Sequence, residues 1–224
     1  NMLVNTRDQK FVLYEQIGID KLFETEKYAE YNRETVDMML NEAEKLAIEV
    51  LLPTYDKGDK EGCRFEKGRV KVPACFHDAY RKFCEGGWLN CMRSVESGGQ
   101  GMPNTVSQAC YEFFQAANYP LIMYPGLTNG AAGLIDRFGT PEQKKKYMEK
   151  MYTGEWGGTM CLTEPGAGSD VGSLKTTAKR LPDGTYSIQG TKIFISSGDH
   201  DLTPNNVHTV LARIEGDPPG TRGI

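Results

Sequence analysis

A glycine-rich segment in the last third of the chain has the residue types and the spacing to hold a ligand. It spans residues 163–170 and reads Thr-Glu-Pro-Gly-Ala-Gly-Ser-Asp. Closely spaced glycines let a backbone approach a ligand, and successive N–H groups there form a concavity that binds anions. On composition alone, a glycine-rich turn without a ligand explains these residues equally well.

Two common nucleotide-binding motifs do not fit this segment. Gly166, Gly168 and Gly172 are spaced as GxGxxxG, one residue longer than the dinucleotide-binding fingerprint. The residues that follow, 174–179, contain the β-branched pair Thr176-Thr177 and are flanked by turns, whereas the fingerprint needs a helix N-terminus for the pyrophosphate. A Walker loop is excluded as well, because Gly-Lys-Ser/Thr does not occur in the chain.

A metal centre is not expected. The cysteines form no CxxC pair, and His77, His200 and His208 are too scattered for a ligand set. We therefore interpret the cysteines as small buried hydrophobes in a reducing compartment, which predicts a cytoplasmic protein. They are Cys63, Cys75, Cys84, Cys91, Cys110 and Cys161.

Composition and charge exclude further classes of protein. The chain has 224 residues, a formal net charge of −4 and a mean hydropathy of −0.49. It has no apolar run of about 18 residues, which a membrane span needs, and its first residues lack the features of a secretory signal. The part before Thr159 carries −3 and the rest −1. Neither has the concentrated positive charge that nucleic-acid binding requires, so no nucleic-acid partner and no membrane span are expected.

The elements that must position the glycine-rich segment are helical up to about Thr153. Apolar residues recur at helical spacing most clearly over residues 35–52, where Asn32 is the expected N-cap and Pro53 the expected end. An exposed hairpin is expected at 63–70. Further helices are expected over residues 76–83, 104–117, 127–138 and 140–152.

The best-marked helix start in the chain is at Thr140. This residue can act as the cap, Pro141 suits the first helical position, and Glu142 and Gln143 add acceptors in the first turn.

After Thr153 the hydrophobic period changes from 3.6 towards 2, which predicts strands. Pro182-Asp183-Gly184 is a turn signal, because proline presets φ and glycine accepts a positive φ. We expect an α+β fold: an N-terminal all-helical domain with an N-terminal extension over residues 1–156, then an antiparallel β-barrel or sandwich domain over 157–224. About seventy residues hold only part of such a domain, so a truncated chain is expected. The predicted strands are 159–162, 174–180, 186–196 and 207–214.

Two blocks of sequence indicate a family. Residues 163–170 are followed, in order and at a suitable distance, by 190–198 (Gly-Thr-Lys-Ile-Phe-Ile-Ser-Ser-Gly). With the helix start at 140–147, these blocks resemble the acyl-CoA dehydrogenase family, and the resemblance extends from about Gly98 to Ile224. Residues 7–14 resemble the N-terminal extension of a longer bacterial subgroup that includes enzymes similar to 3-methylmercaptopropionyl-CoA dehydrogenase.

The resemblance implies an FAD site between the β domain and a C-terminal four-helix domain, which these residues do not contain. The strand of Met160, Cys161, Leu162 and Thr163 would run beside the isoalloxazine ring. Backbone groups of Leu162 and the hydroxyl of Thr163 would bind its pyrimidine side. Gly168 and Ser169 would lie in the loop that meets the cofactor and the acyl-CoA thioester arm, so Ser169 would also contact substrate.

The second block would cover the other edge of the flavin. Phe194, Ile195 and Ser196 would form this cover, with the Ser196 hydroxyl near flavin N5. The family often has Trp and Thr where Phe194 and Ser196 stand, so an aromatic shield and a hydroxyl donor are both retained. Met123 and Tyr124 stand where the family's helical domain lines the acyl-chain pocket. Core packing is the competing interpretation for both residues.

The implied reaction is α,β-desaturation of an acyl-CoA thioester, with hydride transfer to FAD and electrons passed on to an electron-transfer flavoprotein. The carboxylate base is expected beyond Ile224, and Glu164 is expected to form the loop rather than to act as this base. The full-length protein is expected to be a homo-oligomer, and the 224-residue chain to be inactive alone.

Two alternatives remain open at this stage: an acyl-CoA oxidase on the same scaffold, or a non-catalytic interaction fragment with exposed sheet edges. His200 follows the second block and is interpreted as a surface residue, with a functional role as the competing interpretation because a histidine titrates near neutral pH.

Overall fold

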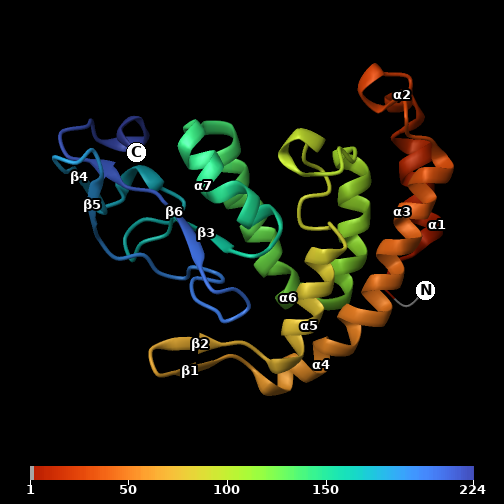
Figure 1. Cartoon of the computed structure of the whole chain (residues 1–224), viewed down its shortest axis with the longest axis horizontal. Helices are drawn as coiled ribbons and strands as arrows, with labels where there is room; N and C mark the ends of the chain where they lie inside the picture. The colour runs from red at the N-terminus through yellow and green to blue at the C-terminus, as the bar shows by residue number, and fades with distance from the viewer. Residues whose placement is uncertain (1–2) are drawn as a thin grey trace.

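The structure, a computed structural model, describes residues 3–224. Helices form one side of the molecule and strands the other, and the N-terminal helices lie at the end farthest from the strands (Figure 1). The expected order of a helical region followed by a β region is confirmed. Within residues 3–224, none of the helices combines the length and the apolar character that a membrane crossing requires.

The first third of the chain is a series of helices packed on one core. Asn32 is the N-cap of α3 as expected, because its side chain accepts a hydrogen bond from Thr35 N–H at 2.9 Å. Val36, Leu40 and Ala43 form the buried stripe of this helix. The elements are α1 (Thr6–Phe11), a π-helix (Val12–Gln16), α2 (Asp20–Phe23), a 3-10 helix (Glu26–Tyr28), α3 (Arg33–Leu46), a π-helix (Ala47–Leu51) and α4 (Leu52–Glu61).

The expectation that Pro53 ends this helical run is wrong. A π-helical turn, Ala47–Leu51, separates α3 from α4, and Pro53 falls in the first turn of α4. Proline has no N–H, and the first turn of a helix leaves its N–H groups without intrahelical partners. The π-turn resets the hydrogen-bond register just before the proline, so the chain stays helical to Glu61.

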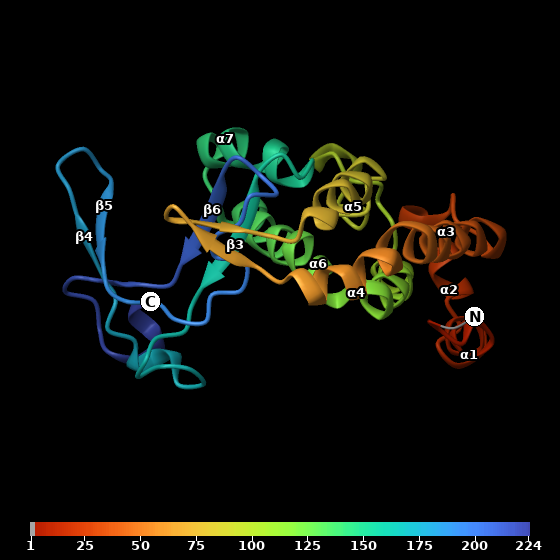
Figure 2. The ribbon, with the colours of Figure 1, turned by 90° about the horizontal axis from the view of Figure 1, so that it is seen from below.

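The expected hairpin is present and projects from the helices towards the β part (Figures 1 and 2). β1 (Arg64–Glu66) and β2 (Arg69–Lys71) are antiparallel. Lys67 and Gly68 at the tip both have positive φ, 52° and 80°, as the favoured two-residue hairpin turn requires. Helix α5 (Ala74–Glu85) follows.

Helix α6 (Asn104–Phe138) is two helices joined at Asn118, whose φ of −159° and ψ of 79° are not helical. The Asn118 side chain accepts from Leu121 N–H at 3.0 Å and so caps the second helix. The second helix was expected only after Pro125, and this expectation is wrong. The cap puts Pro120 in the first turn, where its missing N–H costs little, and Pro125 lies inside the helix.

Helix α7 (Pro141–Tyr152) begins as expected. Thr140 Oγ1 accepts from Gln143 N–H at 3.3 Å, and the Gln143 side chain accepts from Thr140 N–H at 2.9 Å. This reciprocal capping box satisfies two N–H groups at the helix start.

The β part contains less antiparallel pairing than expected. Only β4 and β5 are antiparallel, whereas β3 pairs with β6 and β4 with β7 in parallel. The turn at Pro182-Asp183-Gly184 returns the chain directly, while long connections bring the other strands back in the same direction. The expected strand over 186–196 ends at Gln189, and that over 207–214 is interrupted. The strands are β3 (Gly157–Cys161), β4 (Thr177–Arg180), β5 (Tyr186–Gln189), β6 (Asn206–Val210) and β7 (Arg213–Ile214).

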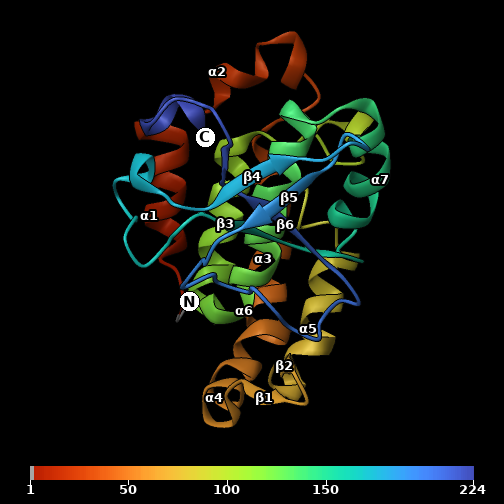
Figure 3. The ribbon, with the colours of Figure 1, turned by 90° about the vertical axis from the view of Figure 1, so that its left-hand side faces the viewer.

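Strands β3 and β6 lie between the helices and the β4–β5 hairpin (Figures 2 and 3). β3 starts with two glycines at the contact with α6. A Cβ atom added at Gly158 would come within 3.0 Å of the Ala131 side chain and 3.2 Å of the Thr128 backbone. Gly158 N–H donates to Thr128 Oγ1 at 3.0 Å. The strand therefore approaches the helix more closely than a side chain would allow, and this contact sets the start of the glycine-rich segment.

Candidate functional site

The glycine-rich segment leaves β3 and turns back on itself. Glu164 and Ala167 exchange two backbone hydrogen bonds, of 2.9 and 3.2 Å, which close a tight turn around Pro165 and Gly166. A Cβ atom at Gly166 or Gly168 would meet nothing within 4 Å. The backbone of this turn is therefore open to an approaching molecule, and Ser169 lies exposed at its end.

Glu164 is the structural centre of the segment. Its buried carboxylate accepts from the backbone N–H groups of Lys175 at 2.6 Å and Thr176 at 3.0 Å, from the Thr176 hydroxyl, and from Lys192 Nζ at 2.8 Å. Burial opposes ionisation, but these hydrogen bonds outweigh it and lower the pKa of Glu164 to about 2. The interpretation of Glu164 as a loop-forming residue fits this geometry.

The two sequence blocks lie next to each other. Ile193 N–H donates to the carbonyl of Thr163 at 2.9 Å, and Lys192 Nζ donates to the carbonyl of Leu162 at 2.9 Å. Lys192 thus joins the blocks through a main-chain oxygen and through the Glu164 carboxylate. Residues about thirty positions apart in sequence are held within hydrogen-bond distance by a buried ion pair.

The second block is not the expected strand. Phe194 has a φ of 56°, in the left-handed region, and its side chain is 89% exposed. Such a φ is rare for a bulky residue and incompatible with a strand. Gly190 follows the last residue of β5, and a Cβ atom added there would overlap with Thr176. The backbone at Gly190 therefore lies directly against the residue that precedes β4, and the chain bends away after it. An exposed aromatic ring in a strained conformation indicates a functional constraint.

Two hydroxyl groups at the site are free. Among the residues that the structure describes, neither Thr163 Oγ1 nor Ser196 Oγ makes a hydrogen bond, whereas Thr159 and Thr176 close by are both engaged. The Leu162 carbonyl already accepts from Lys192, which leaves the Leu162 N–H as its open backbone group.

The remaining residues of the first block belong to β3. Met160 and Cys161 lie opposite Thr209 and Val210 of β6, and Cys161 is buried. Met160 Sδ accepts from the Thr209 hydroxyl at 3.3 Å. Ile195, in the second block, is half-buried, and its carbonyl accepts from Gly198 N–H at 3.1 Å.

Met123 and Tyr124 are not brought to the glycine-rich segment by any hydrogen bond or ring contact within residues 3–224. Both lie inside α6 rather than at a helix break. The Tyr124 ring packs edge-on against His200, with ring centres 5.0 Å apart, and its hydroxyl lies 3.8 Å from Cys63 Sγ.

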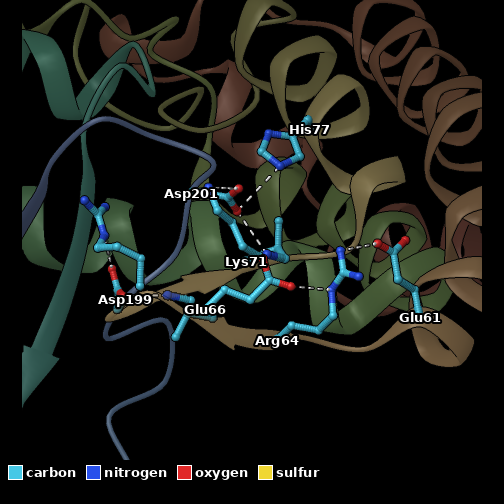
Figure 4. Close-up of polar contacts among 10 residues, drawn as sticks. Glu61, Arg64, Glu66, Lys71, His77, Asp199 and Asp201 are labelled. Atoms are coloured by element: carbon cyan, nitrogen blue, oxygen red, sulfur yellow. Dashed lines mark hydrogen bonds and ion pairs between the residues drawn. The ribbon is translucent and has the colours of Figure 1, made fainter.

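His200 is buried, with 1% of its surface exposed, so the expectation of a surface histidine is wrong. Burial lowers the pKa of His200 to about 4, because the neutral ring is favoured there. Its neighbours Asp199 and Asp201 bind the β1–β2 hairpin (Figure 4). Neither aspartate was predicted as a site residue, although the alternation of Asp199 and Asp201 around His200 is the signal that could have revealed them.

Two cavities lie away from the glycine-rich segment. One, of about 210 Å³, is lined by Cys63, Asn118 and Tyr124 among others. The other, of about 700 Å³, lies between α1 and the start of α6 and contains none of the predicted site residues. Residues 3–224 contain no group of three or more His, Cys, Asp or Glu side chains arranged to hold a metal ion. The six cysteines are free.

Comparison with protein families matches both parts of the chain. Residues 33–155 match the acyl-CoA dehydrogenase N-terminal domain, and residues 159–224 match the acyl-CoA dehydrogenase middle domain. The order of the two matches defines the class: a helical domain followed by the β domain of a flavoprotein oxidoreductase. The chain belongs to the acyl-CoA dehydrogenase family.

Individual relatives agree with this membership. The chain is 42% identical over 197 residues to the 3-methylmercaptopropionyl-CoA dehydrogenase of Ruegeria pomeroyi, covering 88% of this chain and 34% of the relative. It is 39% identical over 231 residues to a butyryl-CoA dehydrogenase of Syntrophomonas wolfei, covering 100% of this chain and 37% of that one.

Among solved structures, an acyl-CoA dehydrogenase from Bacillus anthracis complexed with FAD matches with a TM-score of 0.68 and 29% identity. This match covers 84% of this chain and 30% of the other. The chain thus spans about a third of the length of the curated relatives named above.

Proposed function

We propose that this chain supplies one wall of the flavin site of an FAD-dependent acyl-CoA dehydrogenase. The observation that carries the proposal is the hydrogen bond between Ile193 N–H and the Thr163 carbonyl, at 2.9 Å. It joins two stretches that the family resemblance assigns to opposite edges of one planar ring. We also propose that the boundary between the helical domain and the β domain lies between residues 156 and 157.

The residues present fit FAD. Thr163 and Ser196 offer hydroxyl groups that no residue of the described chain uses, and Phe194 offers an exposed aromatic ring. The open backbone at Gly168 gives room for close approach. When bound, FAD supplies the hydride acceptor, while hydrogen-bond donors of the protein adjust its electronic properties.

In this proposal the Leu162 N–H and the Thr163 hydroxyl bind the pyrimidine side of the ring, next to Met160 and Cys161 of β3. Phe194, Ile195 and Ser196 cover the other edge and limit the access of water. Ser169 binds the acyl-CoA arm from the open turn.

The reaction we propose for the whole protein is α,β-desaturation of an acyl-CoA thioester, with an electron-transfer flavoprotein as the acceptor. It needs a carboxylate that removes the α-proton. Glu164 does not suit this role, since its oxygens already accept from the Lys175 and Thr176 N–H groups and from Lys192. A pKa of about 2 also makes its carboxylate a weak base at neutral pH. We therefore propose that the base comes from residues beyond Ile224.

The experiment is an FAD titration of the 224-residue chain, followed by quenching of flavin fluorescence. We expect weak binding that Thr163→Val and Phe194→Ala each reduce by about tenfold, as the loss of one hydrogen bond or one stacked ring predicts. Thr185→Val, which removes a hydroxyl in the remote β4–β5 turn, is the matched control. Quenching that is absent, or equal in all variants, would contradict the flavin site and favour a non-catalytic interaction module.

The whole protein offers a second readout. An acyl-CoA should bleach its flavin absorbance under anaerobic conditions, and the reduced flavin should reoxidise faster with a dye-linked acceptor than with oxygen. Faster reoxidation by oxygen would indicate the oxidase alternative.

A further inference from the structure

The chain after Ser196 is hydrogen-bonded to the β1–β2 hairpin through the side chains of Asp199 and Asp201, which together we call the side-chain ladder. Val70 N–H donates to Oδ2 of Asp199 at 2.8 Å, and Val72 N–H donates to Oδ1 of Asp201 at 2.9 Å (Figure 4). The partners are about 130 residues apart in sequence. The two aspartates are two residues apart, and so are the two residues whose N–H groups they accept from.

The spacing follows from strand geometry. One edge of β2 is paired with β1, with Val70 opposite Phe65, and alternate N–H groups of a strand point to opposite edges. Asp199 and Asp201 lie in bends of the chain, and both carboxylates face this free edge of β2. Asp199 and Asp201 therefore reach the free edge of the hairpin while His200, between them, packs against Tyr124 in the interior.

Positive groups of the hairpin strengthen the ladder. Arg69 Nε lies 3.3 Å from Asp199 Oδ1, and Lys71 Nζ lies 3.2 Å from Asp201 Oδ2. His77 Nε2, on α5, lies 3.5 Å from Asp201 Oδ1. A hydrogen bond from a backbone N–H to an ionised carboxylate is stronger than one between neutral groups.

We propose that Asp199 and Asp201 are positioning residues for the segment Phe194–Ser196, which they hold against the helical part of the molecule. The inference rests on the proposed function, in which this segment faces the flavin. Its other end is fixed by the bond from Ile193 N–H to the Thr163 carbonyl. The segment is therefore a short bridge with an anchor at each end, and the second anchor is the hairpin.

Two consequences follow from this arrangement. The left-handed conformation of Phe194 is maintained because both ends of the bridge are tied down. The β1–β2 hairpin makes no hydrogen bond to the glycine-rich segment among the described residues, so in this proposal it acts on the flavin site through the bridge.

The first test is hydrogen exchange of the 224-residue chain. In the double variant Asp199→Ala/Asp201→Ala we expect protection to fall by about tenfold or more at the Val70, Val72 and Gly198 amides. Protection at the Ile193 amide, which donates to Thr163, should stay unchanged. The variant Asp199→Asn/Asp201→Asn keeps an acceptor oxygen and should restore most of the protection.

Asp59→Ala is the matched control, because it removes an exposed carboxylate from α4 that forms no ion pair with any residue of the described chain. Unfolding midpoints are measured for every variant, so that a loss confined to the bridge is distinguished from general destabilisation. Equal exchange in wild type and the double alanine variant would overturn the proposal, as would a uniform loss across the whole chain.

The second test is the FAD titration with the same variants. If wild type quenches flavin fluorescence, the double alanine variant should bind FAD about tenfold more weakly, and unchanged binding would overturn the positioning role. If wild type does not bind FAD, the proposed function fails and the flavin role of the bridge with it. The exchange data would then still decide whether the two carboxylates hold the segment.

Discussion

Replacement of Glu164 by Gln tests the centre of the candidate site. The Glu164 side chain is 5% exposed and accepts from the Lys175 and Thr176 N–H groups, the Thr176 hydroxyl and Lys192. Its pKa falls from 4.5 to about 2 because these bonds outweigh the opposing effect of burial. Each pKa unit corresponds to about 1.4 kcal/mol, so the ionised carboxylate contributes up to about 3 kcal/mol to folding at pH 7.

The sign of the pH dependence follows from the lowered pKa. A group whose pKa is lower in the folded state stabilises the protein above its unfolded pKa and loses this effect as the pH falls through the folded pKa. The difference in the free energy of unfolding between wild type and Glu164→Gln should therefore be about 2–3 kcal/mol at pH 7. It should shrink between pH 4.5 and pH 2.

The assay is urea unfolding followed by the fluorescence of Trp88 and Trp156 at a series of pH values. Glu155→Gln is the matched control, because Glu155 forms an exposed ion pair with Lys150 at 3.1 Å. Such pairs contribute about 0–1 kcal/mol, so this variant should stay close to wild type. If the loss in Glu164→Gln is the same at pH 7 and pH 2.5, or no larger than that of the control, the ionised Glu164 carboxylate does not stabilise the fold.

Three further predictions concern the elements that carry the site. Burial lowers the pKa of His200 from 6.5 to about 4. Stability should therefore be complete above pH 6.5 and fall by up to about 3 kcal/mol as the pH drops to 4. His200→Gln should flatten this part of a pH-dependent unfolding curve, and an unchanged slope would count against the burial argument. Thr140→Ala should cost about 1 kcal/mol, seen as a lower thermal midpoint, because it removes the cap of α7; Thr140→Ser should retain most of the stability. Asn118→Ala should cost about 2 kcal/mol by urea unfolding, because the side chain caps the second helix of α6 and also donates to Thr54 Oγ1 at 2.8 Å. Asn118→Asp, which keeps the cap, should cost less, and equal losses would show that the cap is unimportant.

Local signals in the sequence predicted local structure well. The caps at Asn32 and Thr140 and the hairpin turn at Lys67-Gly68 depend on residues within four positions of one another. The helix end expected at Pro53 and the helix start expected after Pro125 are both wrong, because a proline does not by itself fix where a helix begins or ends. Pro53 follows a π-turn and falls in the first turn of α4, and the helix that contains Pro125 begins earlier, at the cap Asn118.

Features that depend on distant contacts were not predictable. The parallel pairing of β3 with β6 joins segments separated by a long connection, and nothing in the alternation of either strand indicates its direction. The burial of His200 likewise depends on distant residues, Tyr124 of α6 and Gly157 of β3. For the candidate site, the family resemblance predicted that the two blocks lie next to each other. The hydrogen bonds of Glu164 and Asp199 could be identified only from the structure.

The glycine pair at the start of β3 constrains how this architecture can be recombined. A methyl group at either position would push the strand away from Thr128 of α6, or from Asn206 and His200. A chimera that joins the β part of one relative to the helical part of another would therefore keep the geometry of the candidate site only if the junction retains both glycines. Chimeras whose crossover lies before Gly157 should therefore fold better than chimeras that insert residues at the junction. They should also fold better than chimeras that replace Gly157 or Gly158 by a residue with a side chain.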